Sequence, residues 1–135
     1  MSPLPGAFFE RHEIRTESCV FRARQAVGRA MDGLQARAIR KTRIVTAASE
    51  IFRNGLIYGG GAIAVIHTDP RDAMVWIECR DEGPGIADVD QALEDGFTSG
   101  TGLGRGLGGA KRLSDRFEIT STAGQGTRIR FAARA

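Results

Sequence analysis

Residues 62–80 read AIAVIHTDPRDAMVWIECR, which is the clearest strand–turn–strand pattern in the chain. Two largely apolar runs, Ala62–Thr68 and Ala73–Arg80, flank the turn residues Asp69–Asp72. Aspartate and proline between two runs of this kind predict a β-hairpin. In the second run apolar side chains alternate with larger or charged ones, so we expect one face of the pair to pack against the protein interior.

Two helices are predicted before this hairpin. The first has Ser18 as its expected cap, continues to about Asp32 and ends at Gly33. The second covers residues 36–57, where apolar side chains recur at spacings of three and four. Ahead of both helices, residues 9–16 are expected to form an edge strand.

The remaining elements follow the hairpin: a short helix over residues 88–94, a glycine-rich stretch over 96–109, a helix over 107–113, and strands over 117–122 and 127–132. The resulting order, β-α-α-β-β-α-α-β-β, predicts an α+β fold, a two-layer α/β sandwich. We expect a mixed, mostly antiparallel sheet with the helices on one face. Residues 1–10 are the expected disordered leader, and residues 11–135 the single domain.

The composition limits the classes of function. Hydrophobic residues make up 41% and charged residues 26% of the chain, as in globular proteins, whereas 18 glycines among 135 residues are roughly twice the average share. Cys19 and Cys79 lack the spacing of a metal site and are expected to be reduced thiols. The sequence has neither a signal peptide nor an apolar run of membrane length, so we expect a cytoplasmic protein that does not contact a membrane.

Basic residues gather in residues 22–43, which hold seven arginines and lysines against one acid. Because the stretch spans two consecutive predicted helices, DNA binding through a helix-turn-helix is one alternative function. That alternative leaves the glycine-rich stretch unexplained, and the net charge of +3 is small, so we expect no nucleic-acid partner. An acidic partner surface or water is the expected neighbour of these side chains.

Two groups of polar residues have spacings that suit chemistry. Glu50 and Asn54 stand one helical turn apart at the edge of an apolar helix face. An amide oxygen suits Mg²⁺ and a carboxylate beside it can deprotonate a hydroxyl, although a solvated polar pair has the same spacing.

Asp81, Gly83 and Gly85 follow a predicted strand. An aspartate there can accept a hydrogen bond from the amine of adenine, although the same residues are good turn formers.

Seven glycines fall between Gly96 and Gly109, directly before a predicted helix. Successive backbone N–H groups and a helix start suit a phosphate. Residues 104–109 match the dinucleotide pattern, but no strand precedes them, and the chain has no Walker-type Gly-Lys-Ser/Thr, so we exclude both of those sites. Thr127, after Gly126 in the last turn, is a candidate hydrogen-bond partner near the base.

In this order and spacing, the motifs resemble those of the GHKL ATP-binding family, which includes histidine kinases, gyrase and Hsp90. The resemblance matches Glu50-x-x-x-Asn54 to the N box, Asp81-x-Gly83-x-Gly85 and Gly102-x-Gly104-x-Gly106 to the two glycine boxes, and Gly126-Thr127 to the terminal motif. It covers about residues 11–133 and implies the Bergerat ATP-binding fold. It is strongest to the small anti-sigma-type serine/threonine kinases of the RsbT type, the switch kinases of the stressosome.

The resemblance implies a role for each matching residue. Asn54 would hold Mg²⁺ against the phosphates, and Glu50 would be the general base toward a serine or threonine hydroxyl. Asp81 would bind adenine in a pocket that includes Gly83, Gly85 and Thr127. The residues that would cover and cradle the phosphates are Gly102, Leu103, Gly104, Arg105 and Gly106. Arg53 and Arg105 are candidates to add positive charge near the γ-phosphate, and a solvated surface position is the alternative for either arginine.

The implied activity is that of an ATP-dependent protein-serine/threonine kinase. Its substrate would be a STAS-domain antagonist protein in a partner-switching system that controls a sigma factor or a stress response. A PP2C-type phosphatase or another regulator is a further partner that the resemblance allows, as is a homodimer. One alternative stays open, a docking switch that binds ATP and partners with little kinase activity. The presence of both Glu50 and Asn54 favours catalysis.

Overall fold

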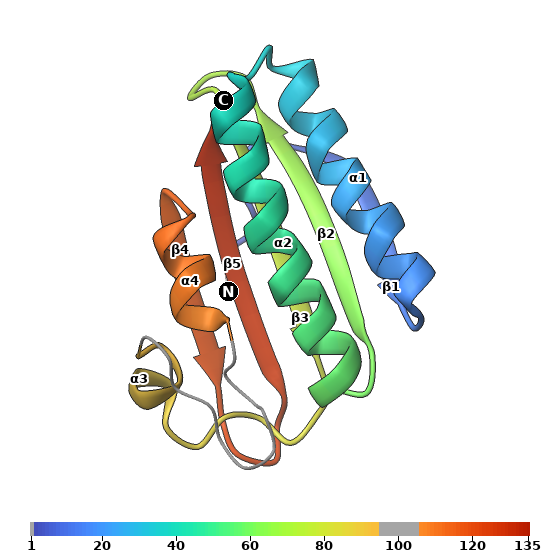
Figure 1. Cartoon of the computed structure of the whole chain (residues 1–135), viewed down its shortest axis with the longest axis vertical. Coiled ribbons are helices and arrows are strands. Elements are labelled where there is room, and N and C mark those ends of the chain that lie inside the picture. Colours follow the sequence, from blue (N-terminus) through green and yellow to red (C-terminus); the bar gives the residue numbers. More distant parts are fainter. Residues whose placement is uncertain (1, 95–105) are drawn as a thin grey trace.

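The computed structural model describes residues 2–94 and 106–135, and its elements follow the predicted order (Figure 1). They are β1 (Ala7–Ile14), α1 (Glu17–Gly33), α2 (Ala38–Tyr58), β2 (Ala62–Asp69), β3 (Met74–Asp81), α3 (Val89–Ala92), α4 (Leu107–Arg112), β4 (Arg116–Ser121) and β5 (Thr127–Arg134). Both predicted hairpins, β2–β3 and β4–β5, are confirmed. Within this described part, no helix has the length and apolar character needed to cross a membrane.

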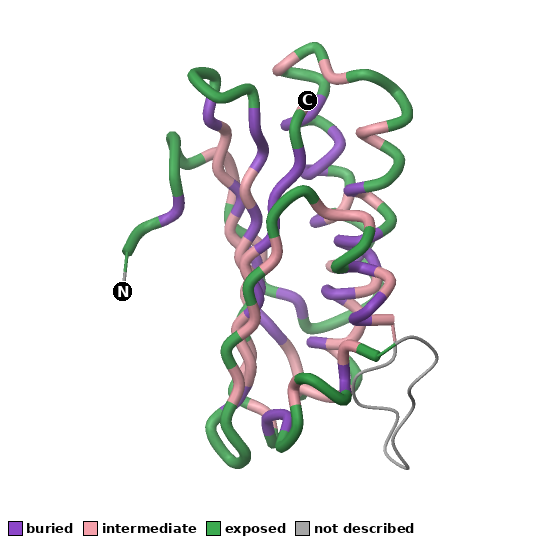
Figure 2. The backbone as a smooth tube through the Cα atoms, turned by 90° about the vertical axis from the view of Figure 1, so that its left-hand side faces the viewer, coloured by how far each residue is buried: buried purple, intermediate pink, exposed green. Residues whose placement is uncertain are grey.

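The five strands form one sheet in the order β1-β2-β3-β5-β4. Every neighbouring pair of these strands is antiparallel. Seen along its edge, the sheet forms one layer and the long helices form a second layer on one side (Figure 2). The predicted two-layer α+β sandwich is therefore confirmed. The sheet was expected to be mixed and mostly antiparallel, and all four pairings of the described strands are antiparallel.

The core lies between the sheet and the two long helices. Side chains alternate along each strand, so one set points toward the helices and the other away from them. Ile77 on β3 and Phe131 on β5 belong to the first set, and Ile51 and Phe52 face them from α2. These four side chains are at most 2% exposed. Removing this apolar surface from water holds the helices on the sheet.

The first helix begins earlier than the sequence predicted. Thr16, and not Ser18, is its cap: the Thr16 backbone is extended, and its hydroxyl accepts a hydrogen bond of 3.3 Å from the Cys19 backbone N–H. Both residue types can cap a helix. The choice between them depends on where the chain leaves β1, and β1 ends at Ile14.

The predicted leader also needs correction, because residues 7–10 belong to β1. Ala7 pairs with Thr68 and Phe8 with His67, so the strand starts two residues before the expected edge strand and ends at Ile14. Leu4 is 7% exposed. The pairing and the buried leucine order a segment that its prolines and glycine indicated to be disordered.

Several basic side chains of residues 22–43 bind within the protein. Arg29 donates to both carboxylate oxygens of Glu10, at 2.9 and 2.8 Å. Lys41 forms an ion pair of 2.9 Å with Asp32. Arg40 donates to the Ala135 carbonyl, Arg43 to the Arg112 carbonyl, and the guanidinium of Arg24 lies over the ring of Phe21. Much of this basic stretch therefore serves to join α1 and α2 to their neighbours.

Phe131→Ala is expected to lower the free energy of unfolding by about 3–5 kcal/mol, because it leaves a cavity under α2. Phe8→Ala is the matched control, since this phenylalanine is 62% exposed, and its expected cost is below about 1 kcal/mol. Urea denaturation followed by circular dichroism measures both values. Similar losses in the two variants would contradict the position of the core.

Candidate functional site

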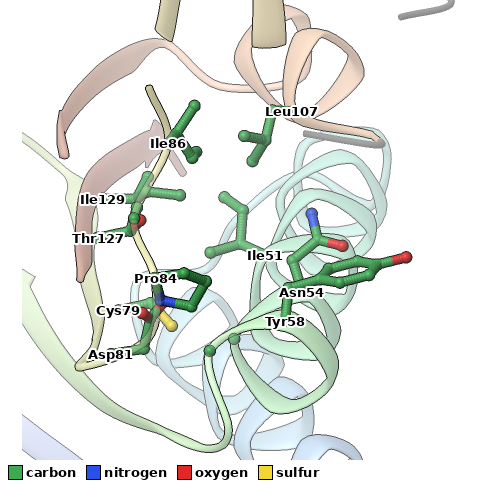
Figure 3. Close-up of a pocket in the computed structure, with 13 residues that line it drawn as sticks. Ile51, Asn54, Tyr58, Cys79, Asp81, Pro84, Ile86, Leu107, Thr127 and Ile129 are labelled. Carbon is green, nitrogen blue, oxygen red and sulfur yellow. The ribbon is translucent and has the colours of Figure 1, made fainter. Parts of the chain in front are cut away.

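A pocket lies between the C-terminal half of α2 and the ends of β3 and β5 (Figure 3). Asn54 and Tyr58 project from α2 on one side, and Asp81 and Thr127 lie on the strand side. Apolar side chains make up most of the remaining wall: Ile51, Cys79, Ile86, Leu107 and Ile129. A mostly apolar wall with a few polar groups is the usual character of a small-molecule site.

Asp81 is the acidic group of this pocket and the last residue of β3. Its carboxylate accepts a hydrogen bond of 2.9 Å from the Gly83 backbone N–H and another from the backbone of Thr127. Burial raises the pKa of the Asp81 carboxyl above its ordinary value, and the two hydrogen bonds oppose that rise. The half-buried carboxylate can accept a further hydrogen bond from an N–H donor of a ligand.

The strand end that carries Asp81 is held by the turn between β4 and β5. The Ser121 hydroxyl accepts from the Ile86 backbone N–H at 2.7 Å and lies 2.8 Å from the Thr127 hydroxyl oxygen. Gly85 has a positive φ of 74°, and a Cβ there would collide with the Thr122 carbonyl oxygen. Only glycine fits this crossing of two backbones without strain. These contacts set the position of Asp81 relative to Thr127.

Glu50 and Asn54 both lie on α2, but only Asn54 lines the pocket. Glu50 stands one turn earlier, beside the start of α4. A Cβ built on Gly106 would come within 2.7 Å of Glu50 Oε2, so the carboxylate borders Gly106 directly. The Asn54 amide therefore faces the pocket, whereas the Glu50 carboxylate faces Gly106.

The interior of this pocket is narrow. Its cavity volume is ≈ 30 Å³, about the share of one liquid water. The surrounding groups otherwise suit a purine, because apolar side chains flank a carboxylate acceptor.

The side chains at the site also determine which metal ion could bind there. Among residues 2–94 and 106–135, no cluster of three or more histidine, cysteine, aspartate or glutamate side chains could hold a metal. Asn54 supplies an amide oxygen at the pocket wall. Such a donor set fits Mg²⁺ bound mainly through a ligand's phosphates and water, which is how this ion commonly binds.

The structure assigns places to most of the predicted site residues. Gly85 and Thr127 line the pocket with Asn54 and Asp81, whereas Gly83 lies behind Asp81 and supports it. Gly106 begins α4 as its cap. Four predicted phosphate-binding residues lie outside the described part of the chain: Gly102, Leu103, Gly104 and Arg105. Arg53, one of two arginines expected near the γ-phosphate, forms an ion pair of 3.6 Å with Glu17.

The sequence did not indicate several residues of the site. Cys79 and Ile129 belong to alternating strands, so the pattern showed that they are buried but not that they border a cavity. Burial raises the pKa of the Cys79 thiol, so this free cysteine stays protonated. Ser121 joins two loops that are 35 residues apart, and no local pattern marks it.

Comparison with known proteins gives consistent matches. The model of the family described as histidine kinase-, DNA gyrase B-, and HSP90-like ATPase matches residues 39–135. The serine/threonine-protein kinase RsbT of Bacillus subtilis is 41% identical over 118 residues, which cover 86% of this chain and 89% of the relative. The anti-sigma F factor of Clostridium acetobutylicum is 33% identical over 62% of each chain, and that of Bacillus thuringiensis 35% identical over 65% of each.

Asp81→Asn is expected to make the chain more stable at neutral pH. Because the folded state raises the pKa of Asp81 from its ordinary value near 3.8, the stability that the group contributes in acid is lost as pH rises through the folded pKa. The variant avoids that loss, so the difference between its free energy of unfolding and that of the unchanged chain should grow from about pH 4 toward pH 7.

Urea denaturation at a series of pH values tests this, with the exposed Asp72→Asn as the control. An advantage of the Asp81 variant that shrinks as pH rises would contradict the sign of the pKa shift.

Proposed function

This chain belongs to the family of histidine kinase-, DNA gyrase B- and HSP90-like ATPases, and from that premise we propose that it is a protein-serine/threonine kinase. It binds ATP in the pocket between α2 and the ends of β3 and β5, and transfers the γ-phosphoryl group to a partner protein. The observation that carries the proposal is the placement of Asn54, Asp81 and Thr127 around one pocket, with Glu50 one turn away. The name of the Bacillus subtilis relative, serine/threonine-protein kinase RsbT, supports it.

Adenine recognition is assigned to the strand side of the pocket. The Asp81 carboxylate accepts a hydrogen bond from the exocyclic amine of adenine, and the ring lies against the apolar wall. Gly83 holds the carboxylate in place through its backbone N–H. Gly85 brings the loop close to the site, and Thr127 adds a hydroxyl beside Asp81.

Phosphate binding is assigned to the α2 side and to the start of α4. The Asn54 amide oxygen holds Mg²⁺, which when bound neutralises charge on the phosphate oxygens. Gly106 is the described end of the glycine-rich stretch, and its backbone approaches the site beside Glu50. The proposal extends to Gly102, Leu103, Gly104 and Arg105 as the residues that cover the phosphates.

Glu50 is the proposed general base. Its carboxylate takes the proton of a serine or threonine hydroxyl while the hydroxyl oxygen forms a bond to the γ-phosphorus. The bond between the γ-phosphorus and the bridging oxygen breaks, and ADP leaves with that electron pair. The carboxylate lies beside Gly106 and not among the residues that line the adenine pocket.

The proposed substrate is a STAS-domain antagonist protein in a partner-switching system that regulates a sigma factor or a stress response. Two matched relatives carry the name anti-sigma F factor, which supports a regulatory protein partner of this kind. A PP2C-type phosphatase or another regulator is the further partner in the proposal. The proposed location is the cytoplasm.

Glu50→Gln is expected to bind ATP as the unchanged chain does, within about twofold, but to transfer phosphate roughly 10²–10⁴-fold more slowly, because only proton removal is lost. The assay follows transfer of label from radiolabelled ATP to a STAS-domain protein. Glu118→Gln, an exposed glutamate on β4, is the control. If the unchanged chain binds ATP and transfers no label, the kinase proposal fails and the docking switch replaces it.

Asn54→Ala is expected to weaken ATP binding about tenfold in Mg²⁺ and much less in EDTA, because the amide oxygen acts through the ion. Calorimetry with a non-hydrolysable ATP analogue measures both affinities. Thr46→Ala, an exposed residue of the same helix, is the control. Equal losses with and without Mg²⁺ would remove Asn54 from the metal site.

A further inference from the structure

The sheet face that the helices leave uncovered carries two arginines side by side. Arg80 on β3 and Arg128 on β5 are directly opposite each other in the antiparallel register. Arg80 is exposed and Arg128 partly exposed. The helices lie on the other side of the sheet (Figure 2). Two like charges at directly opposed positions destabilise a sheet unless another group neutralises them.

The acidic side chains near Arg80 and Arg128 form ion pairs with other residues or make no contact with these two arginines. Glu78, two residues before Arg80, forms an ion pair of 2.7 Å with Arg130, and both side chains are 13% exposed. Glu13 pairs with Arg11 and Arg15. Glu118 lies opposite Arg130 on β4. Within residues 2–94 and 106–135, no hydrogen bond or ion pair joins Arg80 or Arg128 to another side chain.

The two arginines line a cleft of ≈ 280 Å³ at the end of the sheet, beside the β4–β5 turn. Its lining residues also supply the side-chain amide of Gln125 and four hydroxyl groups, those of Thr120, Ser121, Thr122 and Thr127. Asp81 is the one acid among its lining residues, and that carboxylate already accepts the Gly83 N–H on the nucleotide side. The cleft thus combines two positive charges with neutral hydrogen-bond donors.

We propose that this arginine cleft binds a phosphate dianion, either inorganic phosphate or the phosphate monoester of a phosphorylated side chain. A dianion neutralises both guanidinium groups, and its oxygens accept the forked N–H pairs that arginine presents. A carboxylate carries one charge and leaves the pair half compensated. The cleft volume suits a tetrahedral phosphate and does not require any wall to move.

The arginine cleft adjoins the nucleotide pocket, because Asp81 and Thr127 line both, but its two arginines lie on the opposite face of the strands. Asp81 and Thr127 pair in the register immediately next to Arg80 and Arg128. Because successive strand residues point to opposite faces, the first pair faces the pocket under α2 and the second faces away from it. Loss of the arginines should therefore leave nucleotide binding intact, and failure of the kinase proposal would leave the cleft unaffected.

Nuclear magnetic resonance of the arginine Nε–H groups in the unchanged chain tests the proposal directly. Inorganic phosphate and O-phosphoserine are titrated separately at constant ionic strength, with chloride and acetate as reference anions. The Nε–H signals of Arg80 and Arg128 should shift and saturate with both phosphates and respond weakly to the references. The signal of Arg71, in the exposed β2–β3 turn, is the internal control.

Arg128→Gln and Arg80→Gln should each weaken phosphate binding at least about tenfold, because each removes one charge-assisted contact. Arg71→Gln should leave it unchanged, and all three variants should keep the affinity for an ATP analogue. Tighter binding of phosphoserine identifies a phosphorylated side chain as the ligand, and tighter binding of inorganic phosphate identifies the free ion. The proposal is overturned if the Nε–H signals of Arg80 and Arg128 do not shift with either phosphate. It is also overturned if acetate shifts them as much as phosphate does at the same ionic strength.

Discussion

The antiparallel register between β3 and β5 is the constraint on which the other features of the molecule depend. It places Asp81 opposite Thr127 and Arg80 opposite Arg128. A shift of one residue would exchange the faces of all these side chains, because the side-chain period of a strand is two. The Ser121 hydroxyl, which contacts both the loop after β3 and the start of β5, reinforces this register at the end of the sheet.

The same arrangement keeps a carboxylate where water is partly excluded. Burial raises the pKa of Asp81, and two backbone hydrogen bonds offset part of that effect. A fully exposed carboxylate would destabilise the folded chain less. Water would then compete with a ligand's donor for its oxygens. The pocket therefore carries a charged group that burial makes unfavourable for folding, a combination that is common at functional sites.

The two faces of the sheet serve different purposes because the helices cover only one of them. Beneath α1 and α2 the strands contribute apolar side chains to the core. On the uncovered face the same strands present charges, and Glu78 and Arg130 form an ion pair there. Arg80 and Arg128, beside the proposed nucleotide pocket, have no such partner within the described residues, and an uncompensated charge of this kind needs either water or a ligand of opposite charge.

The sequence by itself determined the order of the elements, both hairpins, the α+β class and the ATPase family, since each follows from local periodicity, turn residues or motif spacing. It also placed Glu50 and Asn54 one turn apart. Only the tertiary structure chose Thr16 over Ser18 as the helix cap, ordered residues 7–10 as a strand, and brought Ser121 to the Asp81 loop. It alone separated Glu50 from the pocket wall and paired Arg80 with Arg128. These features depend on contacts between distant residues, and a local pattern does not encode the register of strands that lie far apart in the chain.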